Sequence, residues 1–187
     1  AFADPGGWGP HAALAAARRA LPEDGIATAD SGAHRILMSQ IWRCARPRTL
    51  LQSSGFCTMG CALPLAMGAK IAAPKRDVLA VMGDAGAEMV LGELATLRDL
   101  RLPLVLLVMA DESLALIGLK QRREGLRPLG VDFGGTDWPA LAQAMGGRGV
   151  AARDAEMVET AIREGFRADT FTLVAAALPR SAYDGAF

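Results

Sequence analysis

The sequence predicts an α/β fold, a doubly wound and mostly parallel sheet with helices on both of its faces. Two apolar runs, at 78–82 and 104–109, consist of Val, Leu, Ala and Met with no alternating polar residues. Continuous runs of this kind are typical of parallel strands that are covered on both faces. The segment between them, 87–100, is expected to be a helix. A right-handed β-α-β connection would make the two strands parallel and adjacent.

The first half of the chain supplies the next elements. Residues 1–9 are rich in Gly and Pro and are expected to form a lead-in or linker, so that the domain itself covers 10–187. Segment 10–21 places Ala and Leu on one face and basic residues on another, which is typical of a helix. Small residues in 59–73 would let a helix there pack closely on the sheet. The expected elements are a helix at 10–21, a strand at 25–29, a helix at 33–42, a strand at 49–52 and a helix at 59–73.

The second half continues the alternation of helices and strands that a doubly wound sheet requires. Asp154 precedes an amphipathic segment and is expected to be the N-cap of a helix. The charged run Lys120–Glu124 is expected to be a solvated helix end. The remaining expected elements are a helix at 138–145, a strand at 149–150, a helix at 154–166 and a strand at 171–176.

Two acidic residues stand where the two central strands end. Asp84 follows the first apolar run within Gly83–Gly86, and Asp111 follows the second. Ligands of open α/β sheets bind at the carboxyl ends of the strands. Two carboxylates beside a Gly-rich helix start suit a divalent cation that holds a phosphate-bearing ligand. The alternatives are that Asp84 only caps a helix and that Asp111 only starts a turn.

This stretch resembles the cofactor signature of thiamine diphosphate enzymes, in which Gly-Asp-Gly is followed, after a similar spacer, by Asn. Further segments similar to that family lie at Ala29–His34, Arg46–Thr49, Ser54–Gly60 and Gly92–Thr96. The resemblance covers roughly residues 10–180, and the acetolactate synthase branch is the most similar. It implies a thiamine diphosphate-binding fold.

The resemblance also implies a set of site residues for thiamine diphosphate and Mg²⁺. Met59 would hold the cofactor in its bent shape, the carbonyl of Cys57 would bond its amino group, and His34 would lie near its diphosphate. The implied metal ligands are Asp84, Asp111 and the backbone carbonyl of Ser113. The implied cofactor-binding residues are His34, Cys57, Thr58, Met59, Gly83, Asp84, Ala85, Gly86, Asp111 and Leu114.

Four positions depart from the family pattern. Ala85 and Cys57 replace Gly, Asp111 replaces Asn, and Lys120 replaces a Trp that is common in acetolactate synthases. Slight backbone strain is expected at Ala85, because a position that needs positive φ disfavours alanine. Asp111 would make the site more negative, which should weaken diphosphate binding or leave that carboxyl partly protonated.

The implied function is that of the C-terminal domain of an acetolactate synthase-like 2-oxo acid decarboxylase or carboligase. No residue of this chain matches the Glu that activates the cofactor in the family, so no catalytic residue is expected here. That Glu would come from a pyrimidine-binding domain, in a homodimer, a homotetramer or a separate subunit. FAD, which some relatives bind on a middle domain, would lie outside this chain. The alternatives are a degenerate, non-catalytic homologue that serves assembly or regulation, and a subunit of a split, sulfopyruvate decarboxylase-like enzyme.

Composition argues against several other classes of function. Acidic and basic residues number 20 each, and one Tyr and six Phe offer little for base stacking, so no nucleic acid is expected. The longest apolar stretch, 62–73, is interrupted by Pro64, Gly68 and Lys70, so no membrane span is expected. Three cysteines with two histidines form no zinc pattern, and reduced thiols favour a cytoplasmic location. Neither a nicotinamide-binding Gly-x-Gly-x-x-Gly nor a hydrolase Gly-x-Ser-x-Gly is present.

Overall fold

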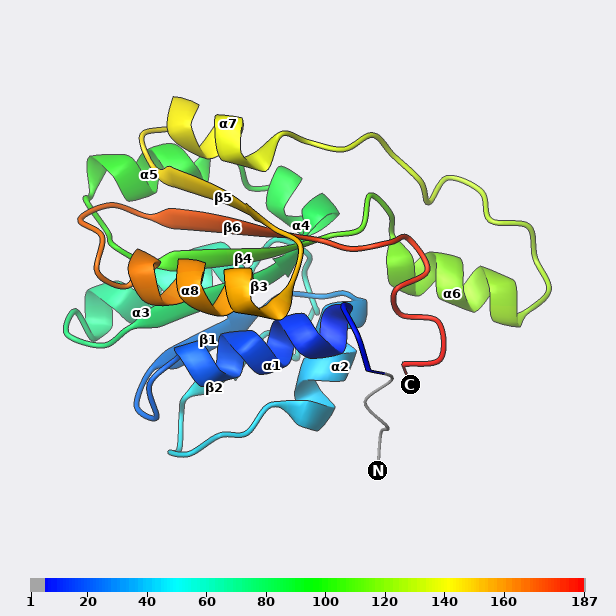
Figure 1. Cartoon of the computed structure of the whole chain (residues 1–187), viewed down its shortest axis with the longest axis horizontal. Coiled ribbons are helices and arrows are strands. Elements are labelled where there is room, and N and C mark those ends of the chain that lie inside the picture. The colour runs from blue at the N-terminus through cyan, green and yellow to red at the C-terminus, as the bar shows by residue number, and fades with distance from the viewer. Residues whose placement is uncertain (1–5, 187) are drawn as a thin grey trace.

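The computed structural model describes residues 6–186 and contains one six-stranded sheet in which every strand pair is parallel (Figure 1). The order of the strands across the sheet is β2-β1-β3-β4-β6-β5. The strands are β1 (Ile26–Ala29), β2 (Leu50–Gln52), β3 (Val78–Gly83), β4 (Val105–Ala110), β5 (Arg148–Ala152) and β6 (Thr172–Ala177). The predicted doubly wound α/β sheet is confirmed. Of the predicted lead-in, residues 1–5 lie outside the described residues.

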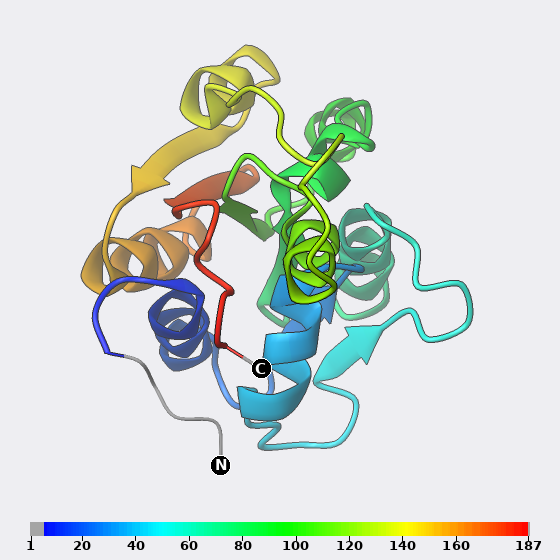
Figure 2. The same ribbon diagram turned by 90° about the vertical axis from the view of Figure 1, so that its right-hand side faces the viewer.

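Helices cover both faces of this sheet (Figure 2). One face packs against α1, α2 and α8, and the other against α3, α5 and α7. Alternate residues of β3 and β4 enter the two cores, which explains why both strands are apolar throughout. The helices are α1 (Pro10–Ala20), α2 (Ala33–Ile41), α3 (Ala62–Ala72), α4 (Asp84–Glu88), α5 (Glu93–Asp99), α6 (Ala115–Arg123), α7 (Trp138–Ala144) and α8 (Ala155–Gly165).

The single helix predicted at 87–100 is wrong, because the segment is divided into α4 and α5. The amides of Val90, Glu93, Leu94 and Ala95 bond carbonyls three residues earlier, which is the tighter 3₁₀ pattern. Gly92, with its poor helix propensity, lies in this connection. The helix predicted at 59–73 begins instead at Ala62, because Gly60 has a φ of 80° that a right-handed helix cannot contain.

The predictions for Asp154 and for the charged run 120–124 agree with the structure. Asp154 is the N-cap of α8, and its side chain accepts a hydrogen bond from the Met157 amide. The charged run Lys120–Glu124 forms the largely exposed end of α6. All three cysteines are free. Within residues 6–186, no helix combines the length and the apolar character that crossing a bilayer would require.

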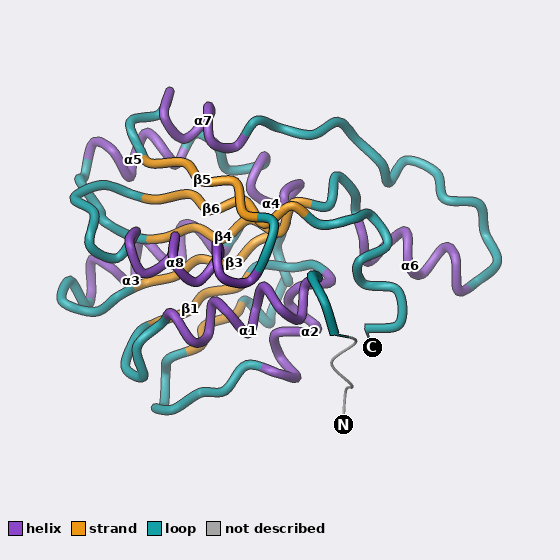
Figure 3. Tube along the Cα trace, in the orientation of Figure 1, coloured by secondary structure: helices purple, strands orange, loops and turns teal. Residues whose placement is uncertain are grey.

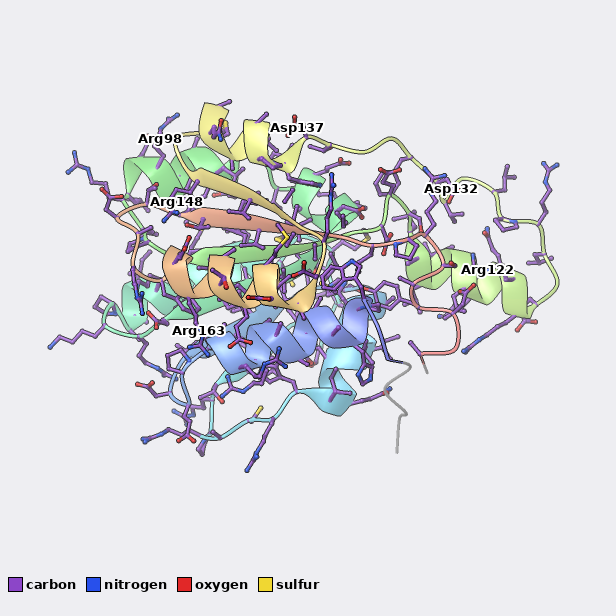
Figure 4. All side chains as sticks on the ribbon, viewed as in Figure 1. Arg98, Arg122, Asp132, Asp137, Arg148 and Arg163 are labelled. Atoms are coloured by element: carbon purple, nitrogen blue, oxygen red, sulfur yellow. The ribbon has the colours of Figure 1, made fainter. Side chains whose placement is uncertain are left out.

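The carboxyl ends of the strands carry the less regular parts of the chain. Helix α6 and the long loop 124–137 extend beyond this end of the sheet (Figure 3). The segment after β6, 178–186, passes alongside α6, and Arg122 of α6 forms an ion pair with Asp184. Arg122 and Asp132 mark this end of the molecule in Figure 4. The adjacent strands β1, β3 and β4 therefore end next to irregular segments of the chain, which can form a binding site.

Candidate functional site

A cleft of about 130 Å³ lies where β1, β3 and β4 end. In the sheet, β2 lies on one side of β1 and β3 lies on the other. The direction of the strand order therefore reverses at β1, and the cleft adjoins this point. Crevices at such switch points are the usual ligand sites of open α/β sheets. We call it the switch-point cleft, and its lining is Ser31–His34, Met59, Gly83–Gly86, Asp111, Ser113–Ile117 and Tyr183.

Asp84 and Asp111 both enter this cleft, and each is 4% exposed. Gly83 pairs with Met109 across β3 and β4, so the two carboxylates leave the sheet as near neighbours. Asp84 Oδ1 accepts a hydrogen bond from the Ala85 amide at 2.8 Å, and Oδ2 accepts one from the Glu112 amide at 2.6 Å. Asp84 therefore does more than begin α4, because it joins the end of β3 to the end of β4.

Asp111 makes the turn that its position after a strand suggested. Its Oδ1 accepts a hydrogen bond from the Ser113 amide at 3.0 Å. Backbone hydrogen bonds also hold the residues on either side of Ser113. The Leu114 amide donates to the Val131 carbonyl, and the Phe133 amide donates to the Glu112 carbonyl. Ser113 is buried and lines the cleft. The turn thus holds Asp111 and Ser113 against the same space without excluding either from ligand binding.

Within residues 6–186, the two carboxylates lack a positively charged partner. Burial raises the pKa of Asp84. Burial, and after it the charge of Asp84, raises the pKa of Asp111 to about 8. Neither forms an ion pair with a basic side chain within the described part of the chain. Since buried charges are normally paired or bound to metal, the pair fits a cation that would favour both ionised forms.

The number of side-chain ligands is nevertheless small. Residues 6–186 contain no group of three or more His, Cys, Asp or Glu side chains that could hold a metal ion. A cation between Asp84 and Asp111 would need backbone oxygens and oxygens of a ligand to complete its coordination. This is how Mg²⁺ is usually held, through one or two carboxylates together with phosphate oxygens.

Another part of the lining of the cleft can attract an anion. Residues 114–117, the start of α6, line it, and no side chain caps this helix. The first amides of a helix lack partners within the helix and carry the positive end of its dipole. A phosphate group is stabilised at such a helix start. The cleft therefore combines a cation-binding side with an anion-binding side.

His34 is buried rather than solvent-facing, and it lies at the third strand end. Its Nε2 is 2.8 Å from Asp30 Oδ1, and Asp30 Oδ2 accepts a hydrogen bond from the Gly60 amide at 2.6 Å. The ring packs near Gly83, since a Cβ at that glycine would lie 3.5 Å from His34 Cε1. Asp30 fixes both the histidine and the turn before α3. Asp30 follows β1 as Asp84 follows β3, and its role was not predicted from the sequence.

Gly86 is needed for this arrangement. A Cβ at residue 86 would lie 2.2 Å from Asp30 Oδ2 and 3.1 Å from the Gly60 amide nitrogen. We expect Gly86→Ala to lower the free energy of unfolding by about 1–3 kcal/mol, because a well-packed site must shift to accept the methyl group. Chemical denaturation measures this. Gly68→Ala is the matched control, because a Cβ at this exposed helical position contacts nothing within 4 Å. A neutral Gly86→Ala would contradict the close packing.

The strain expected at Ala85 is absent, and that prediction is wrong. Ala85 lies within α4 and is not among the residues with positive φ. The left-handed backbone occurs instead at Cys57, whose φ is 50° and which also stands where the family has glycine. The Cys57 side chain is exposed, and its Sγ accepts a hydrogen bond from Arg35 Nη1 at 3.6 Å. Glu112, which follows Asp111, also has a positive φ of 55°, so left-handed backbone lies both in the loop before α3 and in the turn after β4.

The structure brings most of the predicted site residues to one place. The cleft is lined by His34, Met59, Gly83, Asp84, Ala85, Gly86, Asp111, Ser113 and Leu114. Cys57 and Thr58 are exposed and do not line it. Tyr183 does line it, although no sequence motif indicates this residue.

Comparison with known proteins agrees with this geometry. Residues 30–176 match the family described as thiamine pyrophosphate enzyme, C-terminal TPP binding domain. The chain is 33% identical over 152 residues to acetolactate synthase of Bacillus subtilis (strain 168), covering 81% of this chain and 27% of that protein. It is 32% identical to catabolic acetolactate synthase of Raoultella terrigena, covering 79% and 26%.

A third relative carries a more general name. The putative thiamine pyrophosphate-containing protein YdaP of Bacillus subtilis (strain 168) is 28% identical, over 86% of this chain and 28% of its own length. The chain thus spans between 26% and 28% of these relatives. It belongs to the thiamine pyrophosphate (thiamine diphosphate) enzymes, as a C-terminal cofactor-binding domain of the acetolactate synthase-like kind.

Proposed function

We propose that the switch-point cleft binds thiamine diphosphate together with Mg²⁺. The observation that carries this proposal is the pair of buried carboxylates, Asp84 and Asp111, without a basic partner in the described chain and next to the uncapped start of α6. One side attracts a divalent cation and the other a phosphate. A magnesium diphosphate satisfies both at once.

Each part of the cleft has a role in this proposal. Asp84, Asp111 and the carbonyl of Ser113 hold Mg²⁺. The backbone of Gly83, Ala85, Gly86 and Leu114 and the side chain of His34 lie against the diphosphate. Met59 supports the bent cofactor, while Cys57 and Thr58 contact its pyrimidine end where it leaves the cleft. FAD would belong to a domain outside this chain.

We further propose that this domain serves a 2-oxo acid decarboxylase or carboligase of the acetolactate synthase type. When bound, thiamine diphosphate supplies the carbanion chemistry that releases CO₂ from a 2-oxo acid and passes the remaining fragment to a proton or a second carbonyl. This chain positions the diphosphate end and holds the Mg²⁺ that offsets its charge. The activating Glu would come from a pyrimidine-binding domain, so the chain alone is expected to be inactive.

A partner chain follows from the same proposal. It is a second copy of the enzyme, in a homodimer or homotetramer, or a separate pyrimidine-binding subunit. Exposed apolar side chains support such a contact, since Phe56 is 96% exposed beside Cys57 and Ile117 is 46% exposed on α6. The three free cysteines are consistent with a reducing compartment, and the cytoplasm is the expected location.

Thermal unfolding of the chain tests cofactor binding directly. With thiamine diphosphate and Mg²⁺ at about 100 times the Kd, we expect about 2.7 kcal/mol of added stability and a midpoint higher by several degrees. Thiamine diphosphate with EDTA, and thiamine with Mg²⁺, are the controls and should leave the midpoint unchanged.

Two outcomes would contradict parts of the proposal. A midpoint that never responds, in the wild type or in Asp111→Asn, would favour a degenerate homologue that has lost the cofactor. Turnover of a 2-oxo acid by the purified chain would show that no pyrimidine-binding partner is needed.

A further inference from the structure

Tyr183 occupies the switch-point cleft from the segment that follows β6. The Leu178 amide donates to the Ala110 carbonyl at 2.8 Å, which attaches the beginning of this segment to the end of β4. Arg180 then pairs with Glu112 at 3.1 Å and donates to the Phe133 carbonyl at 3.1 Å. Asp184 pairs with Arg122 of α6. Tyr183 therefore lies between two attachments that join different parts of the site.

The hydroxyl of Tyr183 is buried and lacks a partner. The residue is 2% exposed, and its oxygen forms no hydrogen bond within residues 6–186. A phenylalanine would fill the same space without an unsatisfied polar atom. Since buried hydroxyls are nearly always hydrogen-bonded, an unpaired one next to a cleft indicates a partner that occupies the cleft.

The uncapped start of α6, which lines the same cleft, indicates that this partner is a phosphate group. The carboxylates of Asp111, Asp84 and Asp30 are close enough for their charges to act on the phenol, after the larger effect of burial, and both effects raise its pKa. A phenol is uncharged near pH 7 in any case, and it can donate one hydrogen bond. Phosphate oxygens are strong acceptors, and hydrogen bonds to charged acceptors are the stronger ones.

We propose that Tyr183 is a ligand-binding residue whose hydroxyl donates a hydrogen bond to the phosphate end of the ligand in the switch-point cleft. This inference rests on the proposed function, because the phosphate is that of the Mg²⁺-bound diphosphate. Asp84 and Asp111 hold the cation, and Tyr183 adds an uncharged donor for the anion from a part of the chain outside the family signature. The C-terminal segment is then part of the binding site.

The proposal predicts opposite effects on the free and the bound states. Tyr183→Phe removes an unsatisfied hydroxyl from the ligand-free chain, so its unfolding midpoint should stay the same or rise. The same change removes a donor from the bound state, so the Kd of thiamine diphosphate with Mg²⁺ should rise about tenfold. A hydroxyl with a merely structural role would give a lower midpoint and an unchanged Kd.

Thr172→Val is the matched control. The Thr172 hydroxyl is also buried and without a partner in the described chain, but it lies at the start of β6, the end opposite the cleft. Its removal should leave the Kd unchanged. Calorimetric titration measures the affinities of the wild type, Tyr183→Phe and Thr172→Val. Each chain is titrated with thiamine diphosphate, with inorganic pyrophosphate and with thiamine, always in the presence of Mg²⁺. Only the two probes that carry phosphate should discriminate Tyr183→Phe from the wild type.

A spectroscopic measurement gives a second readout, because Tyr183 is the one tyrosine of the sequence. Chain labelled with 3-fluorotyrosine should show a single ¹⁹F resonance that moves on addition of pyrophosphate or thiamine diphosphate with Mg²⁺, and not on addition of thiamine. Equal affinities in the wild type and Tyr183→Phe, or a resonance that does not move, would overturn the inference while the proposed function stands. A wild type that binds no phosphate-bearing probe would overturn both.

Discussion

Replacing Asp84 with asparagine is expected to abolish the Mg²⁺-dependent stabilisation of this chain by thiamine diphosphate. The change removes a full negative charge from the cation-binding side of the cleft. The stabilisation of about 2.7 kcal/mol that is expected with cofactor at 100 times the Kd should therefore vanish. It should also weaken the ligand-free chain. The carboxylate accepts two backbone hydrogen bonds, from Ala85 and Glu112, and an amide has only one oxygen to offer. An amide N–H left without an acceptor costs about 1–3 kcal/mol.

Differential scanning calorimetry of the wild type, Asp84→Asn and Asp132→Asn, with and without the ligand, checks this expectation. Asp132→Asn is the matched control, because it makes the same chemical change at an exposed residue near the same end of the molecule. It should leave both the ligand-free midpoint and the ligand-induced shift unchanged. A Mg²⁺-dependent shift that survives in Asp84→Asn would show that the cation is held elsewhere.

Asp111→Asn is expected to act in the opposite direction, and its effect should depend on pH. The folded chain raises the pKa of Asp111 to about 8, against about 3.9 in an unfolded chain. A carboxyl with a raised pKa stabilises the fold in its protonated form. Its contribution is therefore fully present below about pH 4 and is lost as the pH rises toward 8. The loss can reach about 1.4 kcal/mol per pH unit.

Asparagine cannot ionise, so the variant should lose this part of the pH dependence. Without ligand, the unfolding free energy of the wild type should fall between pH 5 and 8, relative to Asp111→Asn, by up to about 1.4 kcal/mol per pH unit. Denaturation at a series of pH values measures the difference. Parallel curves for the two chains would show that Asp111 has an ordinary pKa. Asp132→Asn should again follow the wild type.

The hydrogen bonds explain why the two acids differ in their tolerance of asparagine. Asp111 accepts a single backbone hydrogen bond, from Ser113, and an asparagine oxygen can accept it as well. The family pattern accordingly has Asn at this position and Asp at the position of Asp84. With one negative charge fewer near the diphosphate, Asp111→Asn should also bind thiamine diphosphate with Mg²⁺ more tightly. We therefore expect the departure at residue 111 to weaken cofactor binding without abolishing it.

How far the sequence predicts this molecule depends on the range of the interactions involved. The strands β3 and β4 are recognisable because their apolar residues are consecutive, and Asp84 and Asp111 follow from the rule that ligands bind where such strands end. The division of 87–100 into α4 and α5 depends on hydrogen bonds to carbonyls three residues earlier, and a helical pattern of apolar residues does not reveal this spacing. Strain was expected at Ala85, but left-handed backbone near the site occurs instead at Cys57 and Glu112.

The residues that were missed are placed by contacts between distant parts of the chain. Tyr183 enters the cleft because Arg180 pairs with Glu112 and Asp184 with Arg122, which are separated by 68 and 62 positions. No local pattern encodes such pairings. Asp30 could have been recognised, since it follows β1 by the same rule that indicated Asp84 and Asp111.

The way the cleft is joined together also bears on how the chain reaches its folded state. The bond from Asp30 to Gly60 spans 30 positions, and that from Asp84 to Glu112 spans 28. Parallel pairings between such distant segments are slow to form, because a long stretch of chain must be ordered before any contact rewards it. A chain in which β1, β3 and β4 are not yet paired therefore cannot form the cleft. Cofactor would bind only molecules whose sheet is complete, and by binding them it would withdraw them from the pool of partly folded chains that are prone to aggregate.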